Sequence, residues 1–409
     1  MVRRLVTLSL ALISAGCKMM APHDSYVEPR RNLGLAKATS ALTAEDRAYL
    51  RERSAFASKL ATAMKLGADG QNVCVSTFSV DLALCMLANG SQGNTFDALA
   101  KCLSWKDARV DKFNLANSRI LDLLASEPGA EVRVSNSIWN VIPVQFKKNY
   151  QADMEKHYAA QVKKLGSAGE GALKQVNDWA KYRSNGRITK IIDSLDKSTY
   201  TILVSMCTFD GTWPEPLTRK SDRVFIGISG ARRTPFVSSD RLGESFTFPG
   251  GTGVRVPYAD STLSLNLLLP QAGSPPMTVL SAPALKAVLD RQSTDKCSFE
   301  FPIFNISSAL DIRDPIRSLC GDTLFDAGED FKPMSHAEIS EAKISLMIHR
   351  TWIKVDENGT KAAAGTATVV KGGEVPSAPK KIVFDRPFAF VILEEETKVP
   401  LFLGVVNQP

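Results

Sequence analysis

The residue patterns that usually signal catalysis are absent or incomplete in this sequence. The run Gly227–Ala231 superficially matches the G-x-S-x-G turn that presents a nucleophilic serine, but Ala231 stands where the last glycine is required. The chain contains neither an H-E-x-x-H zinc motif nor a phosphate-binding P-loop, and none of its seven cysteines shows C-x-x-C spacing. We therefore predict no enzyme activity, no metal site and no cofactor.

The segment Gly359–Lys380 could instead take part in chemistry as a substrate. It contains no aromatic residue, and loops of this length in compact domains are usually functional or disordered. In an extended chain alternate side chains face opposite ways, and the two lysines of residues 360–371, Lys361 and Lys371, share one face. The other face is small or β-branched and uncharged, and it comprises Thr360, Ala362, Ala364, Thr366, Thr368 and Val370.

This pattern lets the segment enter a packed sheet without burying a charge, which would be costly. Joined to a sheet on both sides, its backbone would form two ladders of hydrogen bonds that the exposed loop lacks. A flexible linker of alanine, glycine and threonine is the alternative interpretation of the same composition.

The elements that must position this loop mix helices and strands without regular βαβ alternation, which favours an α+β fold. Thr43 is suited to cap a helix over residues 44–65, with Asp46 as the acid of a capping box. Two further helices are predicted over residues 79–89 and 176–183. Strands are predicted over residues 72–76, 132–140, 201–209, 263–270, 343–355, 381–393 and 399–406.

The stretch Glu357–Ala367 resembles the hinge of the serpin family, Glu-Glu-Gly-Thr-Glu-Ala-Ala-Ala-Ala-Thr-Ala, and further family-like motifs follow one another in the right order. The resemblance covers about residues 45 to 409. The other motifs that carry it are Asn72–Val80, Asn177–Trp179, Asn185–Ile188, Phe209–Trp213, Phe325–Asp326, Asp330–Phe331, His349, Asp385–Phe388 and Phe402–Asn407.

The resemblance implies an α+β serpin fold, with a large central, mostly antiparallel sheet, further sheets, eight to nine helices and an exposed reactive-centre loop. It also implies a suicide-substrate inhibitor of serine, or cysteine, proteases. The protease would cleave the loop and become trapped as an acyl-enzyme while the loop inserts into the central sheet. A non-inhibitory binding or chaperone-like member of the family is the alternative, and the uncharged inserting face favours inhibition.

Residue roles follow by motif. Trp213 corresponds to the breach, where the loop first enters, and Ser76, Ser79 and His349 correspond to the shutter beneath the opening strands. The implied hinge residues are Glu357, Gly359, Thr360, Ala362, Ala363, Ala364 and Thr366.

Counting sixteen residues on from Glu357 places the reactive bond at Gly373–Glu374, whereas counting back from Pro387 places it nearer Pro376. The chain also departs from the family pattern at several positions. The departures are Thr77 for a proline, Ser205 for the shutter asparagine, Ile303 for a breach lysine and Lys361 for a hinge glutamate.

The N-terminus indicates export. Two arginines precede the apolar run Leu5–Ile13, and Cys17 follows Ala-Gly as in the lipobox of bacterial lipoproteins, although Ser14 departs from that pattern. We predict a lipoprotein signal peptide over residues 1–16, a tether over 17–42 and a serpin domain over 43–409. An ordinary secretory signal is the alternative.

A lipidated Cys17 would anchor the protein to a membrane, and we expect an outer-membrane lipoprotein facing the periplasm or the cell exterior. The expected partner is a target serine protease in a covalent complex with a monomeric inhibitor.

The remaining charged and thiol groups have simpler interpretations. The formal charge of +7 is modest for 409 residues, and no aromatic-plus-basic motif accompanies it, so we expect no nucleic-acid partner. Cys74, Cys85 and Cys207 lie in apolar segments and are expected to be free, buried thiols. One basic group could bind a polyanion or simply form a solvated helix face, and it comprises Lys147, Lys148, Lys156, Lys163 and Lys164.

Overall fold

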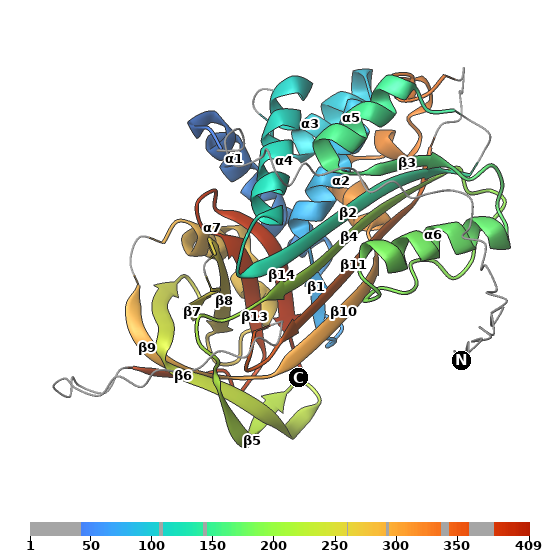
Figure 1. The fold of residues 1–409 in the computed structure, drawn as a ribbon. Coiled ribbons are helices and arrows are strands. Elements are labelled where there is room, and N and C mark those ends of the chain that lie inside the picture. The colour runs from blue at the N-terminus through green and yellow to red at the C-terminus, as the bar shows by residue number, and fades with distance from the viewer. Residues whose placement is uncertain are drawn as a thin grey trace, which may run out of the picture.

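The structure is a computed structural model, and it describes residues 42–105, 109–141, 145–259, 261–291, 294–336, 343–359 and 380–409. These ranges form two β-sheets with helices packed around them (Figure 1). The α-helices are α1 (Ala44–Ala63), α2 (Thr77–Asn89), α3 (Gly93–Cys102), α4 (Val110–Ala125), α5 (Lys148–Tyr158), α6 (Glu170–Arg183), α7 (Ala282–Leu289) and α8 (Arg313–Cys320). Short 3-10 helices are η2 (Pro276–Leu280), η3 (Thr323–Phe325) and η4 (Gly328–Phe331).

The five-stranded sheet has the order β10-β11-β4-β2-β3. Its central pair, β11 and β4, is parallel, and each of these strands is antiparallel to its outer neighbour, β10 or β2. The small edge strand β3 is parallel to β2. The strands are β10 (Phe304–Asp311), β11 (Ile344–Val355), β4 (Thr201–Gly211), β2 (Ala130–Asn140) and β3 (Gln161–Lys164).

The second sheet has the order β1-β14-β13-β8-β7-β6-β9-β12, and β5 pairs with β6 off this path. All its pairs are antiparallel except β9 with β12. The strands are β1 (Val73–Val75), β5 (Thr218–Gly227), β6 (Gly230–Phe248), β7 (Gly251–Pro257), β8 (Leu263–Pro270), β9 (Asp295–Pro302), β12 (Lys381–Val383), β13 (Phe388–Glu394) and β14 (Val399–Val406).

The five-stranded sheet is most deeply buried at β4, every residue of which is buried. In Figure 1 α6 lies across one face and α2 lies behind the other. Trp179 of α6 packs edge-on against Trp139 of β2, with ring centroids 5.8 Å apart, in a small core that also contains Met206 and Ile348. The other face joins the main core, in which α2 is buried almost all round. This burial positions α2 directly beneath the central strands.

The predicted elements are present, with three main differences at their boundaries. Helices α3, α4, α5, α7 and α8 and strands β3, β5, β6, β7, β9 and β10 were not predicted. The Thr43–Asp46 capping box of α1 is present, but α2 begins two residues earlier than predicted, with Ser76 as its N-cap. Helix α6 begins at Glu170, several residues before the predicted start. The strand predicted over 381–393 is two strands, β12 and β13, because Pro387 lies between them and β12 pairs with β9 while β13 pairs with β8 and β14.

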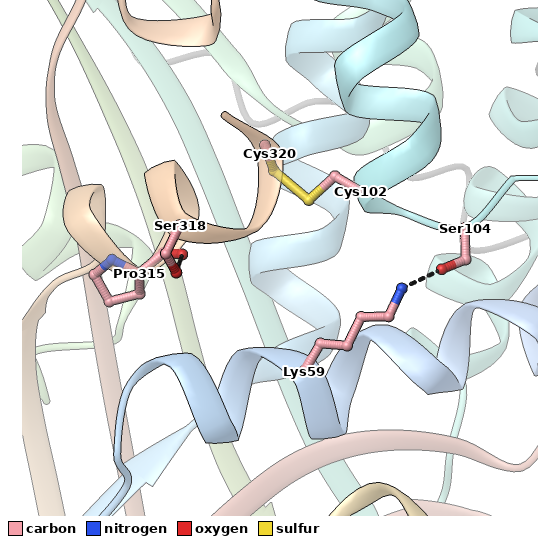
Figure 2. Close-up of a disulfide and its surroundings, with 6 residues drawn as sticks. All are labelled: Lys59, Cys102, Ser104, Pro315, Ser318 and Cys320. Atoms are coloured by element: carbon pink, nitrogen blue, oxygen red, sulfur yellow. Dashed lines mark hydrogen bonds between the residues drawn. A yellow bond between two sulfur atoms is a disulfide. The ribbon is translucent and has the colours of Figure 1, made fainter. Parts of the chain in front are cut away.

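One disulfide joins the C-terminal residues of two helices. Cys102 of α3 and Cys320 of α8 are bonded, with Cα atoms 4.9 Å apart (Figure 2). Cys74, Cys85 and Cys207 are buried and free, as predicted from their apolar surroundings, and Cys297 is also free. Among the described residues, no helix is long and apolar enough to cross a membrane.

Candidate functional site

The candidate site is the seam between the two parallel strands at the centre of the five-stranded sheet. β11 and β4 pair directly from Ile344 opposite Thr201 to Ile353 opposite Phe209. β11 then leads through a turn at residues 356–359 into segment 360–379, which lies outside the described residues. A strand returning from that turn between β11 and β4 would run antiparallel to both. The seam is therefore the one place in this sheet where a hairpin from β11 could add a strand with two antiparallel neighbours.

A buried polar cluster holds the middle of the seam together. His349 of β11 lies opposite Ser205 of β4, and both are almost completely inaccessible to solvent. The backbone N–H of Ser76, at the start of α2, donates to His349 Nε2 at 2.9 Å. Nδ1 is therefore the protonated nitrogen, and it lies 3.0 Å from the Ser205 carbonyl oxygen. One imidazole thus links α2, β11 and β4.

Ser79 extends this cluster to the next strand. Its hydroxyl lies 2.9 Å from the Ser205 hydroxyl, and its carbonyl accepts a bond of 3.1 Å from the side-chain amide of Asn136 on β2. Ser76 caps α2 by accepting from the Ser79 backbone N–H. Parting β11 from β4 must break the bond between His349 and Ser205, so this cluster resists opening.

Burial controls the protonation of His349. The pKa of His349 is lowered to about 3, chiefly by loss of water around the ring; the bond to the Ser205 carbonyl opposes this shift and the nearby Arg350 charge adds to it. The imidazole is neutral at physiological pH. A neutral ring is what the geometry needs, because Nε2 must accept the Ser76 hydrogen bond.

The end of the seam next to the turn is organised around Trp213, which follows β4. The Trp213 ring stacks on Tyr258, with centroids 4.6 Å apart and planes inclined by 10°. Its indole N–H donates to the Asp356 carbonyl oxygen at 3.0 Å. Trp213 therefore holds the first residue of the turn that follows β11, at the point where a returning strand would enter the seam.

Gly359 closes this turn in a conformation that suits only glycine. Its φ is +102°, and it forms an isolated antiparallel bridge with Thr212. A Cβ atom at this position would lie 2.1 Å from the carbonyl oxygen of Gly211. The backbone after β11 can approach the end of β4 this closely because residue 359 has no side chain.

Comparisons with known proteins agree with this arrangement. A family model described as "Serpin (serine protease inhibitor)" matches residues 51–409. The chain belongs to the serpin family. Serpin-ZXA from Oryza sativa subsp. japonica is 27% identical over 394 residues, covering 90% of this chain and 99% of that protein. The leukocyte elastase inhibitor of Sus scrofa is 26% identical over 372 residues, covering 87% of this chain and 97% of that protein.

Solved serpin structures share the fold. The crystal structure of a thermophilic serpin, tengpin, in the native state matches with a TM-score of 0.79 at 24% identity. The match covers 88% of this chain and 94% of that one. The predicted α+β serpin fold is confirmed, with eight α-helices in the described ranges.

The structure brings together the residues that the serpin motifs singled out, in two groups. Ser76, Ser79 and His349 form one cluster, and Trp213 contacts the turn that contains Glu357 and Gly359. Their roles as shutter, breach and hinge stay predictions. The predicted residues outside the described ranges are Cys17, Thr360, Ala362, Ala363, Ala364, Thr366, Gly373 and Glu374.

Sequence reasoning missed one partner in this serpin. Many serpins pair the hinge glutamate with a lysine at the position of Ile303, and here Arg219 of β5 approaches Glu357 instead, at 3.0 Å. The backbone N–H of Leu217 also donates to the Glu357 carbonyl oxygen at 2.7 Å. The Arg219 side chain is 60% exposed and the Glu357 side chain 25%, so solvent weakens their attraction. No local signal connects residues 138 positions apart.

In the part of the chain that the structure describes, no group of three or more His, Cys, Asp or Glu side chains could hold a metal ion. The contacts described above are hydrogen bonds, aromatic packing and backbone pairing. What such a site can do chemically is hold two strands together and release them.

Proposed function

We propose that this serpin is a suicide-substrate inhibitor of a serine protease. The observation that carries the proposal is the parallel seam between β11 and β4, joined directly to the segment that could fill it. β11 is 12 residues long, and the stretch from Thr360 to Val370, whose alternate residues are uncharged, is 11 residues long. A returning strand of this length would match β11 along nearly its whole length.

The protease supplies the chemistry in this mechanism. Its serine Oγ attacks the carbonyl carbon of the reactive bond, which we place at Gly373–Glu374, and forms an ester as the peptide bond breaks. The new amino group leaves with the C-terminal part of the chain. Insertion of segment 360–370 then carries the ester-linked protease along the seam before water can hydrolyse the acyl-enzyme.

The seam determines whether the loop inserts before water hydrolyses the acyl-enzyme. Insertion replaces one parallel pairing with two antiparallel ones. The uncharged face of the segment carries no lysine, because Lys361 and Lys371 lie on its opposite face. The relative from Sus scrofa is named for inhibition of an elastase, which is consistent with the small residues around Gly373.

The decisive experiment incubates the mature protein with trypsin, chymotrypsin, pancreatic elastase and subtilisin in separate reactions. We expect at least one covalent complex that survives SDS, and we expect protein nicked in the loop to unfold at a higher temperature than intact protein. Mass spectrometry of the released C-terminal peptide would identify the cleaved bond. Cleavage by all four enzymes without a complex, and without a rise in melting temperature, would instead support a non-inhibitory binding protein.

We also propose that the protein is exported and anchored through a lipidated Cys17, which lies outside the described residues. The support is the charged start, the short apolar run and the Ala-Gly-Cys sequence of the N-terminus. Labelling with a radioactive fatty acid in an expressing bacterium should mark the wild-type protein and not Cys17→Ser. Equal labelling of both proteins, or of neither, would contradict the anchor.

A further inference from the structure

Exposed apolar side chains are concentrated on one hairpin of the described structure. Five large hydrophobic residues are exposed in the described ranges, and three of them lie within five residues at the end of β5. Val224, Ile226 and Ile228 are 48%, 61% and 58% exposed. Single exposed hydrophobic residues need no explanation, but a contiguous group often marks a binding surface. We call the face formed by Val224, Ile226, Ile228 and Ala231 the hairpin face.

Strand geometry explains how these side chains come to share one side. Alternate residues of β5 point the same way, so the intervening Phe225 is buried, with its ring centroid 6.5 Å from that of Phe388. On β6, Ala231 lies opposite Ile226 and Arg233 lies opposite Val224. The hairpin face is therefore apolar at its centre, with an arginine at its border.

The hairpin is rich in basic residues, although two of its arginines, Arg219 and Arg223, are paired with Glu357 and Glu300. Between Thr218 and Arg233 the chain carries five basic residues and one acidic residue, Asp222. Arg232 and Arg233 are both exposed, and Arg233 donates to the Asp222 backbone carbonyl rather than to its carboxylate. A partner suited to this surface would present an apolar patch bordered by acidic side chains.

The hairpin lies beside both described ends of the segment proposed to carry the reactive bond. At one end Arg219 of β5 contacts Glu357, two residues before the turn closes at Gly359. At the other, Glu300 of β9 pairs with Arg223 and, at 2.6 Å, with Lys381. Arg223 directly precedes Val224, so β5 brings the hairpin face close to one described end of that segment, with the Arg223 side chain on the opposite side of the strand.

We propose that the hairpin face is a second contact surface for the target protease, used while the protease binds the loop. This inference rests on the proposed function and adds a determinant of protease choice outside the loop. Addition of a strand from a second copy is less well supported, because backbone N–H groups of Ile226 and Ile228 already donate to Asp385 and Asn407. The hairpin face also lacks the tryptophan and tyrosine that anchor proteins at membrane interfaces.

The test replaces the three exposed side chains together, as Val224→Thr, Ile226→Thr and Ile228→Thr. Threonine keeps the β-branch that suits a strand and removes apolar surface. The matched control is Leu115→Gln on α4, a single exposed apolar side chain outside the hairpin face that is 48% exposed. Second-order rate constants and stoichiometries of inhibition are measured with whichever of trypsin, chymotrypsin, pancreatic elastase or subtilisin reacts fastest with wild type.

We expect the second-order rate constant of inhibition to be about tenfold lower for the triple variant than for wild type. A change of this size is typical when a few central contacts of an interface are lost. The stoichiometry should stay unchanged, because insertion after acylation does not involve this surface. The control should behave as wild type, and the wild-type rate should fall as salt rises, because salt screens the basic border.

Other outcomes would overturn the proposal in recognisable ways. If the triple variant still forms complexes, with a second-order rate constant within about twofold of the wild-type value, the hairpin face is not a contact surface for the protease. The proposed inhibitory function would still stand. Binding to phosphatidylglycerol vesicles that only the triple variant loses, with an unchanged rate, would assign the hairpin face to a membrane. Light scattering that shows a wild-type dimer and a monomeric triple variant would assign it to a second copy. If none of the four enzymes forms a complex with the wild-type protein, both the proposed inhibitory function and the proposed contact surface are contradicted.

Discussion

The middle of the candidate site and the turn at one end of it are held by different kinds of interaction. At its middle, His349 is completely buried and links three elements through hydrogen bonds of 2.9 to 3.0 Å. At the turn, Glu357 is held by a backbone bond and by an arginine that is mostly exposed to solvent. Buried hydrogen bonds are costly to break because their partners are left without water, whereas exposed ion pairs contribute little. The seam should therefore open first at the turn and last at His349.

The largest effect should come from a charge placed on the uncharged face of the loop at its point of entry. We expect Thr360→Arg to abolish inhibition and to leave a substrate, because insertion would bury an unpaired guanidinium. Ala363→Arg is the matched control, since residue 363 shares the outward face with Lys361 and should still inhibit. The stoichiometry of inhibition is measured for both variants. Equal loss of inhibition in the two would contradict the prediction that residues 360 and 363 lie on opposite faces of the inserted strand.

A smaller but substantial effect should follow from removing the imidazole at the middle of the seam. His349→Leu leaves the Ser76 N–H and the Ser205 carbonyl without their buried partner, which should cost about 2–5 kcal/mol. The expected result is a clearly lower thermal midpoint and faster heat-induced aggregation. His349→Gln, which can both donate and accept, should recover part of the loss. If leucine were as stable as histidine, the cluster would not hold the seam.

Acid should weaken the same cluster. Because the pKa of His349 is lowered from 6.5 to about 3 in the folded protein, the unfolded chain binds a proton between these values and the folded chain does not. Stability is thus greatest above pH 6.5 and falls as the pH drops toward 3, by on the order of a few kcal/mol.

Thermal midpoints between pH 7 and 5 measure this slope before most carboxylates titrate. His349→Gln should flatten the slope. The pKa of His157 is also lowered, chiefly by burial, so His157→Gln shows how much of the slope that second histidine contributes. A slope that is the same in wild type and His349→Gln would assign the acid sensitivity to other groups.

The sequence predicted best what depends on short-range patterns. His349 lies within an apolar strand that periodicity predicted, so it was placed on the correct element before any contact was known. Ser76 was predicted at the end of a strand and is instead the N-cap of α2. The Thr43–Asp46 capping box was also predictable, because it needs only four consecutive residues.

Contacts between distant segments could not be predicted in this way. The Cys102–Cys320 disulfide spans 218 residues, and nothing near either cysteine distinguishes it from the buried thiols. Arg219 reaches Glu357 because β5 starts next to the turn after β11, a fact of topology rather than of local pattern. The break between β12 and β13 was visible as Pro387, but the exchange of neighbours that makes them separate strands was not.

The smallest effect should come from the exposed ion pair at the turn. We expect Arg219→Ala to lower stability by less than about 1 kcal/mol, because both side chains remain partly solvated and the Leu217 bond to the Glu357 backbone persists. Thermal midpoints compare it with Arg241→Ala, whose pairing with Glu215 at 3.8 Å is also exposed. A loss as large as that of His349→Leu would reverse the order of opening, because the turn would then hold the seam as firmly as its buried middle.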